Sequence, residues 1–349
     1  MPPAADLAYE PPIMTDISTL AADALDRIAD PATGKGLIEG GRAAPPRIAE
    51  GTASVILDVS GWSGEQRLSI ERSIKGALTA LPGIADARVA MTAEKKERRL
   101  IAVGSGKGGV GKSTVSANIA VALARAGIRT GLIDADIHGP SQPRLMGVEG
   151  YRPVAKDKVL EPVMTPHGVG LLSMGQLAKP GQAIAWRGPM TASALGQLVD
   201  GDWGDAEVLI VDLPPGTGDI QLSMIQKHRP AGAIIVSTPQ DLALIDATRA
   251  IDLFTQANVP IVGLIENMAG YACPHCGEIS DPFGSGGAEA AAGSMGLPFL
   301  GRVPLQMAIR TASDAGEPPA AGDGPEGAMF HLIARQLADW LNLSPVQRF

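Results

Sequence analysis

The chain has 349 residues, 45% of them hydrophobic and 19% charged, which is enough for about two domains with buried cores. Its formal net charge of −8 argues against nucleic acid as a partner, because a protein that binds a polyanion needs a basic face. The apolar runs are far shorter than the ~20 residues of a membrane span, and the opening MPPAADLAYEPP does not resemble a secretory signal. With only two cysteines, the composition fits a reducing cytoplasm. We therefore expect a cytoplasmic protein that binds neither nucleic acid nor a membrane.

The first part of the chain predicts a small α+β domain over residues 15–93, after a proline-rich stretch at 1–14 that we expect to be disordered. A helix is expected from Thr15 to Asp30-Pro31, with an apolar face made by Ile17, Leu20, Ala24 and Ile28. A strand at 53–62, a helix with Ile70, Ile74, Ala77, Leu78 and Leu81 on one face, and a strand at 86–92 complete the domain. The charged run EKKERR, residues 94–99, is expected to be a solvated linker.

From residue 100 to 342 strands and helices alternate, which predicts an α/β domain with a mostly parallel sheet covered by helices on both faces. The expected strands are 100–105, 130–136, 207–213, 231–237, 259–265 and 297–303, and helices are expected at 113–126 and 241–257. After a Pro/Gly-rich loop at 314–327, a last helix carries Phe330, Ile333, Leu337, Trp340 and Leu341 on one face. Its polar face has too few basic residues for a membrane-surface helix, so we expect it to pack on the core, followed by a tail at 343–349.

The segment GSGKGGVGKST, residues 104–114, lies between a predicted strand and a predicted helix and satisfies the GxxxxGK[ST] phosphate-loop pattern. Its glycines allow successive backbone N–H groups to point inward as an anion nest, and the following helix N-terminus adds positive potential. Lys112 is expected to bind the β- and γ-phosphates of ATP, and Ser113 to bind Mg²⁺. The residues expected to contact the nucleotide are Gly106, Lys107, Gly108, Gly109, Val110, Gly111, Lys112, Ser113 and Thr114.

A second lysine, Lys107, directly follows the first glycine of the loop. It is either a surface residue on a tight turn or the additional lysine of the deviant Walker A pattern, found in ATPases that dimerise face to face. In those ATPases the additional lysine reaches the phosphates of the partner chain, as an arginine finger does. The adjacent Gly108 and Gly109 favour the second interpretation, which assigns a catalytic role to both Lys107 and Lys112.

Three aspartates lie at the carboxyl ends of two predicted strands of the same sheet. Because ligand-binding residues collect at the carboxyl ends of parallel strands, we expect Asp134 and Asp212 to hold Mg²⁺, mostly through water. Asp136 is expected to orient or activate the attacking water, and Gly216, in a Pro-Pro-Gly-Thr-Gly turn, to contact the γ-phosphate with its N–H. Any one of these aspartates alone is also compatible with a helix cap.

Together these motifs resemble the Mrp/NBP35 (ApbC-like) family of iron–sulfur cluster carrier ATPases, within the deviant Walker A class of P-loop NTPases that also holds MinD, ParA and nitrogenase iron protein. The resemblance covers residues 100 to about 342 and includes DADIHGPSQPRLMG, WRGPM (186–190), LIVDLPPGTGDIQL, STPQDLALIDATRAI, GLIENMAGYACPHCG and SDAGEPP. It implies that Asn267 contacts the adenine and that GRVPL borders the base. The first ~95 residues resemble the DUF59 (MIP18-like) domain, although SGWSG (60–64) stands where such domains commonly carry a cysteine.

The two cysteines, Cys273 and Cys276, lie three residues apart in CPHCG. A [4Fe–4S] cluster or a structural Zn²⁺ needs about four ligands, so one chain supplies half of a site. A face-to-face homodimer would supply four thiolates, which predicts a [4Fe–4S] cluster bridging two chains. A Zn²⁺ site with the same four thiolates remains open, as does His275 as a third ligand; a thioredoxin-like redox pair is disfavoured because the motif follows a strand.

Three functions compete on these grounds. The first is an ATPase that carries the cluster and delivers it to apo iron–sulfur proteins. The second is a positioning or partition ATPase of the MinD or ParA type, which predicts a basic amphipathic C-terminal helix or a basic surface, and neither is visible in the sequence. The third is a metabolic kinase or ligase, which has no use for the paired cysteines. We expect the first.

Overall fold

The computed structural model describes residues 16–60, 62, 64–92, 98–137, 139–156, 158–177, 188–273 and 275–343. The predicted disorder at 1–14, most of the linker and of the tail, part of the WRGPM motif, and Pro274 lie outside these residues. The chain forms two compact units, Met1–Lys96 and Glu97–Phe349, and each is described by itself.

The described residues of the first unit form a three-stranded sheet and two helices. The sheet has the order β1 (Arg47–Ala49), β2 (Thr52–Asp58), β3 (Asp86–Thr92), and the helices are α1 (Ile17–Asp26) and α2 (Gly64–Thr79). β2 and β3 are parallel, with α2 as the crossover, and β1 is antiparallel to β2. Helix α2 buries Ile70, Ile74 and Leu78, as its spacing predicts. Of the predicted face of α1, Ile17 and Ile28 pack against the core of this unit, whereas Leu20 is exposed. Ala21 and Leu25, which the prediction omitted, are fully buried, so the buried face is shifted toward them.

A buried ion pair connects the loops of this unit. Asp30, 1% exposed, accepts hydrogen bonds from Arg42 Nε at 3.1 Å and from Trp62 Nε1 at 3.0 Å. The Arg42 guanidinium also lies over the Trp62 ring, 5.2 Å from its centroid. Trp62 therefore has a packing role in this unit.

The second unit is a layered α/β structure. Its strands are β4 (Arg99–Gly104), β5 (Thr130–Asp134), β6 (Val154–Lys156), β7 (Val159–Glu161), β8 (Val163–Met164), β9 (Gly170–Ser173), β10 (Val208–Asp212), β11 (Gly232–Ser237), β12 (Ile261–Ala272), β13 (Ile279–Ser280) and β14 (Phe299–Leu305). Its helices are α3 (Lys112–Arg125), α4 (Gln142–Leu145), α5 (Met174–Leu177), α6 (Gly188–Val199), α7 (Asp219–Ser223), α8 (Asp241–Gln256), α9 (Gly287–Met295), α10 (Met307–Asp314) and α11 (Pro325–Trp340), with a π-helical turn at Met224–His228 and a 3₁₀ turn at Pro319–Ala321.

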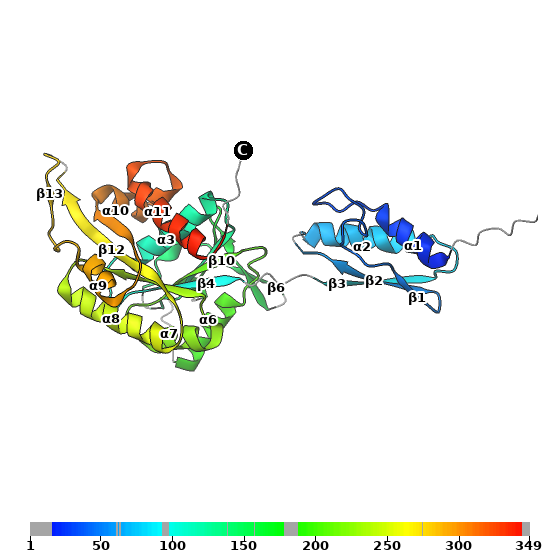
Figure 1. Ribbon diagram of the computed structural model, residues 1–349, viewed down its shortest axis with the longest axis horizontal. Helices are drawn as coiled ribbons and strands as arrows, with labels where there is room; N and C mark the ends of the chain where they lie inside the picture. Colours follow the sequence, from blue (N-terminus) through cyan, green and yellow to red (C-terminus); the bar gives the residue numbers. More distant parts are fainter. Residues whose placement is uncertain are drawn as a thin grey trace, which may run out of the picture. The chain divides into compact units, whose positions relative to one another are not determined.

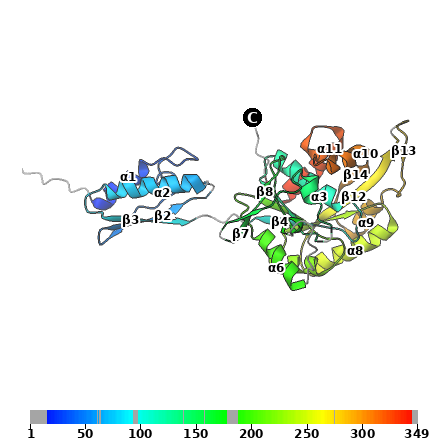
Figure 2. The ribbon, with the colours of Figure 1, turned by 180° about the vertical axis from the view of Figure 1, so that it is seen from behind.

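Nine strands of the described residues form one sheet, in the order β13-β12-β11-β4-β10-β5-β9-β8, with β14 also paired to β12. The pairings are parallel except those of β13 and β8. Helices α3, α10 and α11 lie on one side of the sheet, and α6, α7 and α8 lie on the other (Figures 1 and 2). The predicted fold class is therefore confirmed.

Alternation along the strands explains the two covered faces. In β10, Val208 and Ile210 pack into the core beneath α3 and α11, while Leu209 and Val211 pack into the core on the opposite face. A strand buried on both faces is apolar throughout, and for this reason the sequence predicted the central strands well. The predicted core packing of α11 is also confirmed: Phe330, Ile333 and Leu337 are fully buried, although Trp340 remains 38% exposed at its end. No described helix has both the length and the apolar character to cross a membrane.

Candidate nucleotide-binding site and cysteine pair

The phosphate loop connects β4, in the middle of the sheet, to α3. Gly109 and Gly111 both have a φ of +80°, a conformation that residues with a Cβ rarely adopt. A Cβ on Gly111 would also overlap the side chain of Asn267, and one on Gly106 would overlap the backbone of Asp246. The loop borders a cavity of about 330 Å³, lined by Ser105, Lys107, Gly108, Gly109, Val110, Gly111, Lys112, Ser113, Thr114, Asp136, Ser141, Leu145, Pro215 and Asp314.

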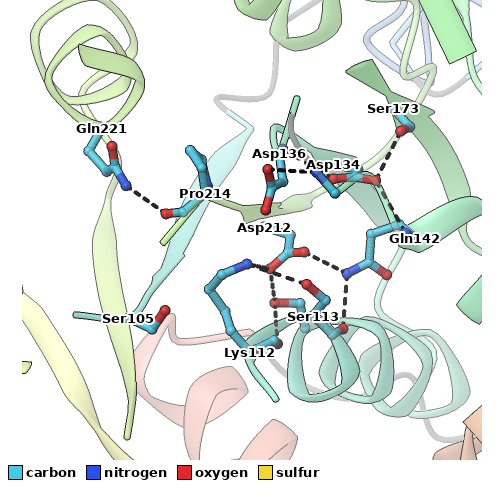
Figure 3. A network of polar contacts seen from close by, with 12 residues as sticks. Ser105, Lys112, Ser113, Asp134, Asp136, Gln142, Ser173, Asp212, Pro214 and Gln221 are labelled. Atoms are coloured by element: carbon cyan, nitrogen blue, oxygen red, sulfur yellow. Dashed lines mark hydrogen bonds and ion pairs between the residues drawn. The ribbon is translucent and has the colours of Figure 1, made fainter. Parts of the chain in front are cut away.

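Lys112, which lines this cavity, forms a buried ion pair with Asp212 (Figure 3). Lys112 Nζ lies 2.6 Å from Asp212 Oδ1, and the two side chains are 6% and 0% exposed. Asp212 also accepts hydrogen bonds from Ser116 Oγ and Gln142 Nε2, both at 2.9 Å. The lysine was predicted to bind phosphates; in this structure its ammonium is paired with the strand-end carboxylate instead.

Asp134 lies on the adjacent strand, fully buried, in register with Asp212. Its Oδ2 accepts from Ser173 Oγ at 2.9 Å and from the Gln142 N–H at 3.2 Å (Figure 3). Burial, together with the charge of Asp212, raises the pKa of Asp134 to about 7. Two buried carboxylates side by side are a suitable place for a divalent cation, because carboxylate oxygens are hard ligands and the cation offsets their negative charge. Ser113, whose hydroxyl lies 3.4 Å from Lys112 Nζ, completes the predicted set of Mg²⁺ ligands.

Asp136 and Gly216 were both predicted to act near the γ-phosphate. Asp136 lines the cavity, and its Oδ1 accepts the Gly139 N–H at 3.2 Å, so the structure places it beside the phosphate loop. The N–H of Gly216, which was predicted to contact the γ-phosphate, donates to the Ser105 carbonyl at 2.9 Å. Gln221 Nε2 holds the same turn by donating to the carbonyls of Pro214 and Gly216.

The two remaining predicted residues contact protein groups. Asn267 is 7% exposed, and its Nδ2 donates to the Val110 carbonyl at 2.8 Å. This hydrogen bond restrains the backbone of the phosphate loop. The resemblance had implied an adenine contact for this residue. Lys107 Nζ donates to Gln240 Oε1 at 3.1 Å, at the N-terminus of α8.

Several polar residues of the site escaped the sequence prediction. Gln142 contacts Ser113, Asp134 and Asp212, and Ser173 binds Asp134 (Figure 3). A signal existed for Ser173, since it ends an apolar run just as Asp134 and Asp212 do, but β9 has only four residues and was not predicted. Gln142 is brought in by α4, a single turn with no apolar periodicity, so the sequence offered no comparable signal.

The cysteine pair lies at the end of a hairpin. β12 continues beyond its predicted end and pairs with β13 through Tyr271–Ser280 and Ala272–Ile279, and the two strands extend from the body of the unit (Figure 1). Cys273 is half-buried and Cys276 is exposed, and both are free thiols. Gly277, with φ +74°, closes the turn by donating its N–H to the Cys273 carbonyl at 2.8 Å.

The turn also changes the chemistry of the first sulfur. The backbone N–H groups of Cys276 and His275, together with the Cys276 side chain, lower the pKa of the Cys273 thiol. A thiolate is the form that binds metal. Among the residues that the structure describes, no three His, Cys, Asp or Glu side chains gather into a metal site, so the donors found at this hairpin are the two sulfurs.

Comparison with known proteins identifies the family. The model of the NUBPL iron-transfer P-loop NTPases matches residues 96–338. This chain belongs to that family. Its relatives include an "iron-sulfur cluster carrier protein" of Deinococcus radiodurans, 39% identical over 333 residues that cover 92% of this chain and 94% of the relative. An Arabidopsis thaliana "iron-sulfur protein required for NADH dehydrogenase, mitochondrial" is 50% identical over 221 residues, 63% of this chain and 70% of that protein. The predicted membership of the iron–sulfur carrier ATPases is confirmed for the P-loop unit.

Solved structures agree with the fold of this family. A nucleotide-binding protein in complex with ADP from Archaeoglobus fulgidus is 37% identical, with a TM-score of 0.58 over 66% of this chain and 90% of that one. The cell division ATPase MinD of Pyrococcus furiosus has a TM-score of 0.53 over 69% of this chain and 99% of that one, at 22% identity. At that identity MinD shares the fold, and no function follows from the likeness.

Proposed function

We propose that this chain is an ATP-dependent iron–sulfur cluster carrier, which holds a [4Fe–4S] cluster between two copies of itself and delivers it to apo iron–sulfur proteins. One observation carries the proposal: a P-loop unit extends a hairpin whose end bears two free thiols, one of them with a lowered pKa. The names of the relatives from Deinococcus radiodurans and other organisms support the same cargo.

The number of ligands supports a bridging site. The chain has two cysteines, whereas a [4Fe–4S] cluster takes about four thiolates. A two-fold axis beside the hairpin would bring two pairs together. The exposed position of Cys276 leaves its sulfur accessible to a second copy and to a recipient protein.

The nucleotide site would act through residues already close together. Ser113, Asp134 and Asp212 fit Mg²⁺, which when bound would neutralise charge on the β- and γ-phosphates. Lys112 would exchange Asp212 for the phosphates, Asp136 would orient the attacking water, and the loop N–H groups would hold the phosphate oxygens.

The roles proposed for the other predicted residues require either a side chain or backbone group to change its partner or a second copy of the chain. Lys107 would reach the phosphates bound by the partner, and Gly216 would contact the γ-phosphate after leaving the Ser105 carbonyl. Asn267 would contact the adenine in addition to Val110. ATP hydrolysis would then change the geometry between subunits, and with it the retention of the cluster.

For the first unit we propose a MIP18-like domain at 15–93, joined by the linker at 94–99 to the ATPase domain at 100–342. The Deinococcus radiodurans relative supports a shared arrangement, because its alignment covers 92% of this chain. This unit carries no cysteine, so it would contribute no thiolate to the cluster. The two free thiols suit a reducing compartment, and we propose the cytoplasm.

Anaerobic reconstitution with iron and sulfide tests the proposal. We expect a broad absorption near ~400 nm, on a species with twice the 35.9 kDa mass of the chain and one cluster per two chains. Cys273→Ser and Cys276→Ser should each abolish it, and Ser280→Ala, on the same hairpin, should not. Colourless protein that binds zinc through the same sulfurs would favour the zinc alternative, and a fully loaded monomer would refute the bridging site.

A further inference from the structure

The side chain of Lys107 is held on its own chain. Its Nζ donates to Gln240 Oε1 at 3.1 Å, and both residues are half-buried. Gln240 is the N-cap residue of α8, but its side chain makes no hydrogen bond to the helix that it caps. The amide oxygen of Gln240 is therefore engaged by the lysine and not by the backbone of α8.

The backbone around Lys107 is held by a hydrogen bond within the loop and by close packing of Gly106 on α8. Ser105 Oγ donates to the Lys107 carbonyl at 2.9 Å. Gly106 lies so close to α8 that a Cβ would overlap the backbone at Asp246 and Ala247. Gly106 thus packs directly on α8, and the Ser105 hydroxyl restrains the backbone of Lys107 beside it.

The electrostatics of this position are unfavourable for an ammonium. The N-terminus of a helix is its positive end, and α8, with 16 residues, turns that end toward Lys107. The Gln240 oxygen, a neutral acceptor, offsets part of the repulsion between the helix N-terminus and the ammonium. A hydrogen bond from a charged donor shifts a conformational equilibrium by about tenfold. Such a contact biases the lysine toward its own chain, yet it breaks when a polyphosphate offers several charged oxygens.

We propose that Gln240 is a positioning residue that keeps Lys107 on its own subunit, and that release from Gln240 frees the ammonium for the phosphates bound by a second copy. This inference rests on the proposed function, which assigns Lys107 a role across the dimer. It adds a control on the rate: the fraction of released lysine limits hydrolysis, while ATP binding to the subunit's own loop is unaffected.

Two substitutions that should change the rate of ATP hydrolysis in opposite directions test the contact between Lys107 and Gln240. Gln240→Glu converts it into an ion pair, and we expect hydrolysis at saturating ATP to fall at least about fivefold. The loss should shrink in 0.5 M salt, because salt screens a half-buried ion pair. Gln240→Leu removes the acceptor and should raise hydrolysis by about fivefold. The KM for ATP should stay within about twofold in both, since the effect is on kcat.

Gln256→Glu is the matched control, because it makes the same change at the exposed, opposite end of α8. A second measurement needs no turnover: reductive methylation followed by mass spectrometry should label Lys107 faster in Gln240→Leu and more slowly in Gln240→Glu. The inference is overturned if both variants shift hydrolysis in the same direction, or if hydrolysis and labelling match the control. Full activity in Lys107→Ala would instead overturn the cross-subunit role itself, and the inference with it.

Discussion

The ion pair between Lys112 and Asp212 leads to a quantitative prediction. The atoms lie 2.6 Å apart and the side chains are 6% and 0% exposed. At an effective dielectric constant of about 20 their attraction is about 6 kcal/mol, which the loss of hydration largely offsets. Removing one partner of such a pair leaves an unpaired buried charge and typically costs about 3–5 kcal/mol.

Lys112→Met keeps most of the side-chain volume and removes the charge. We expect it to lower the free energy of unfolding of the P-loop unit by about 3 kcal/mol at pH 8. The expected loss of stability is at the low end of the usual range because Ser116 and Gln142 still donate hydrogen bonds to Asp212. Asp212→Asn should also destabilise, since it leaves a buried ammonium. The double variant should recover to within about 1–2 kcal/mol of the original protein, because neither charge then remains.

Hydrogen exchange of the β10 amides in rising urea is the appropriate assay, since it reports on this unit separately from the first one. The two single variants and the double variant form a cycle, whose coupling energy should be several kcal/mol. Additive losses, with the double variant the least stable of the three, would refute the reasoning. Such a result would mean that the pair contributes packing alone.

Two further predictions concern residues of the same site. The pKa of Asp134 is raised to about 7 in the folded protein, so between pH ~4 and ~7 the folded form keeps a proton that the unfolded form has lost, and stability falls as pH rises. Asp134→Asn should remove this fall, and urea titrations that give parallel stability–pH curves for variant and original protein would contradict it. Lys107→Ala should bind ATP with an affinity within about threefold, yet lose at least about 100-fold in hydrolysis; normal turnover in a phosphate-release assay would exclude the cross-subunit lysine.

The central strands and the phosphate loop were predictable because each depends on local chemistry. The middle residues of β4, β5, β10 and β11 are apolar, since both faces of these strands are covered. The spacing of the loop glycines and Lys112 follows from the shape of a phosphate, so the loop is recognisable without its surroundings. The cysteine pair was visible for the same reason, although the hairpin that presents it was not.

Contacts between segments that lie far apart in the sequence could not be predicted from local sequence patterns. The apolar face predicted for α1 included Leu20, but packing in the first unit leaves Leu20 exposed and buries Ala21 and Leu25. Gln142 reaches Asp212 across 70 residues, and Lys107 reaches Gln240 across 133. No periodicity encodes such pairs, because they depend on strand order and on how closely a loop approaches a helix. Residue types and spacing thus identified the phosphate loop and the thiols. The partners that restrain the loop could be found only from the fold, because a hydrogen bond requires proximity in space and not in sequence.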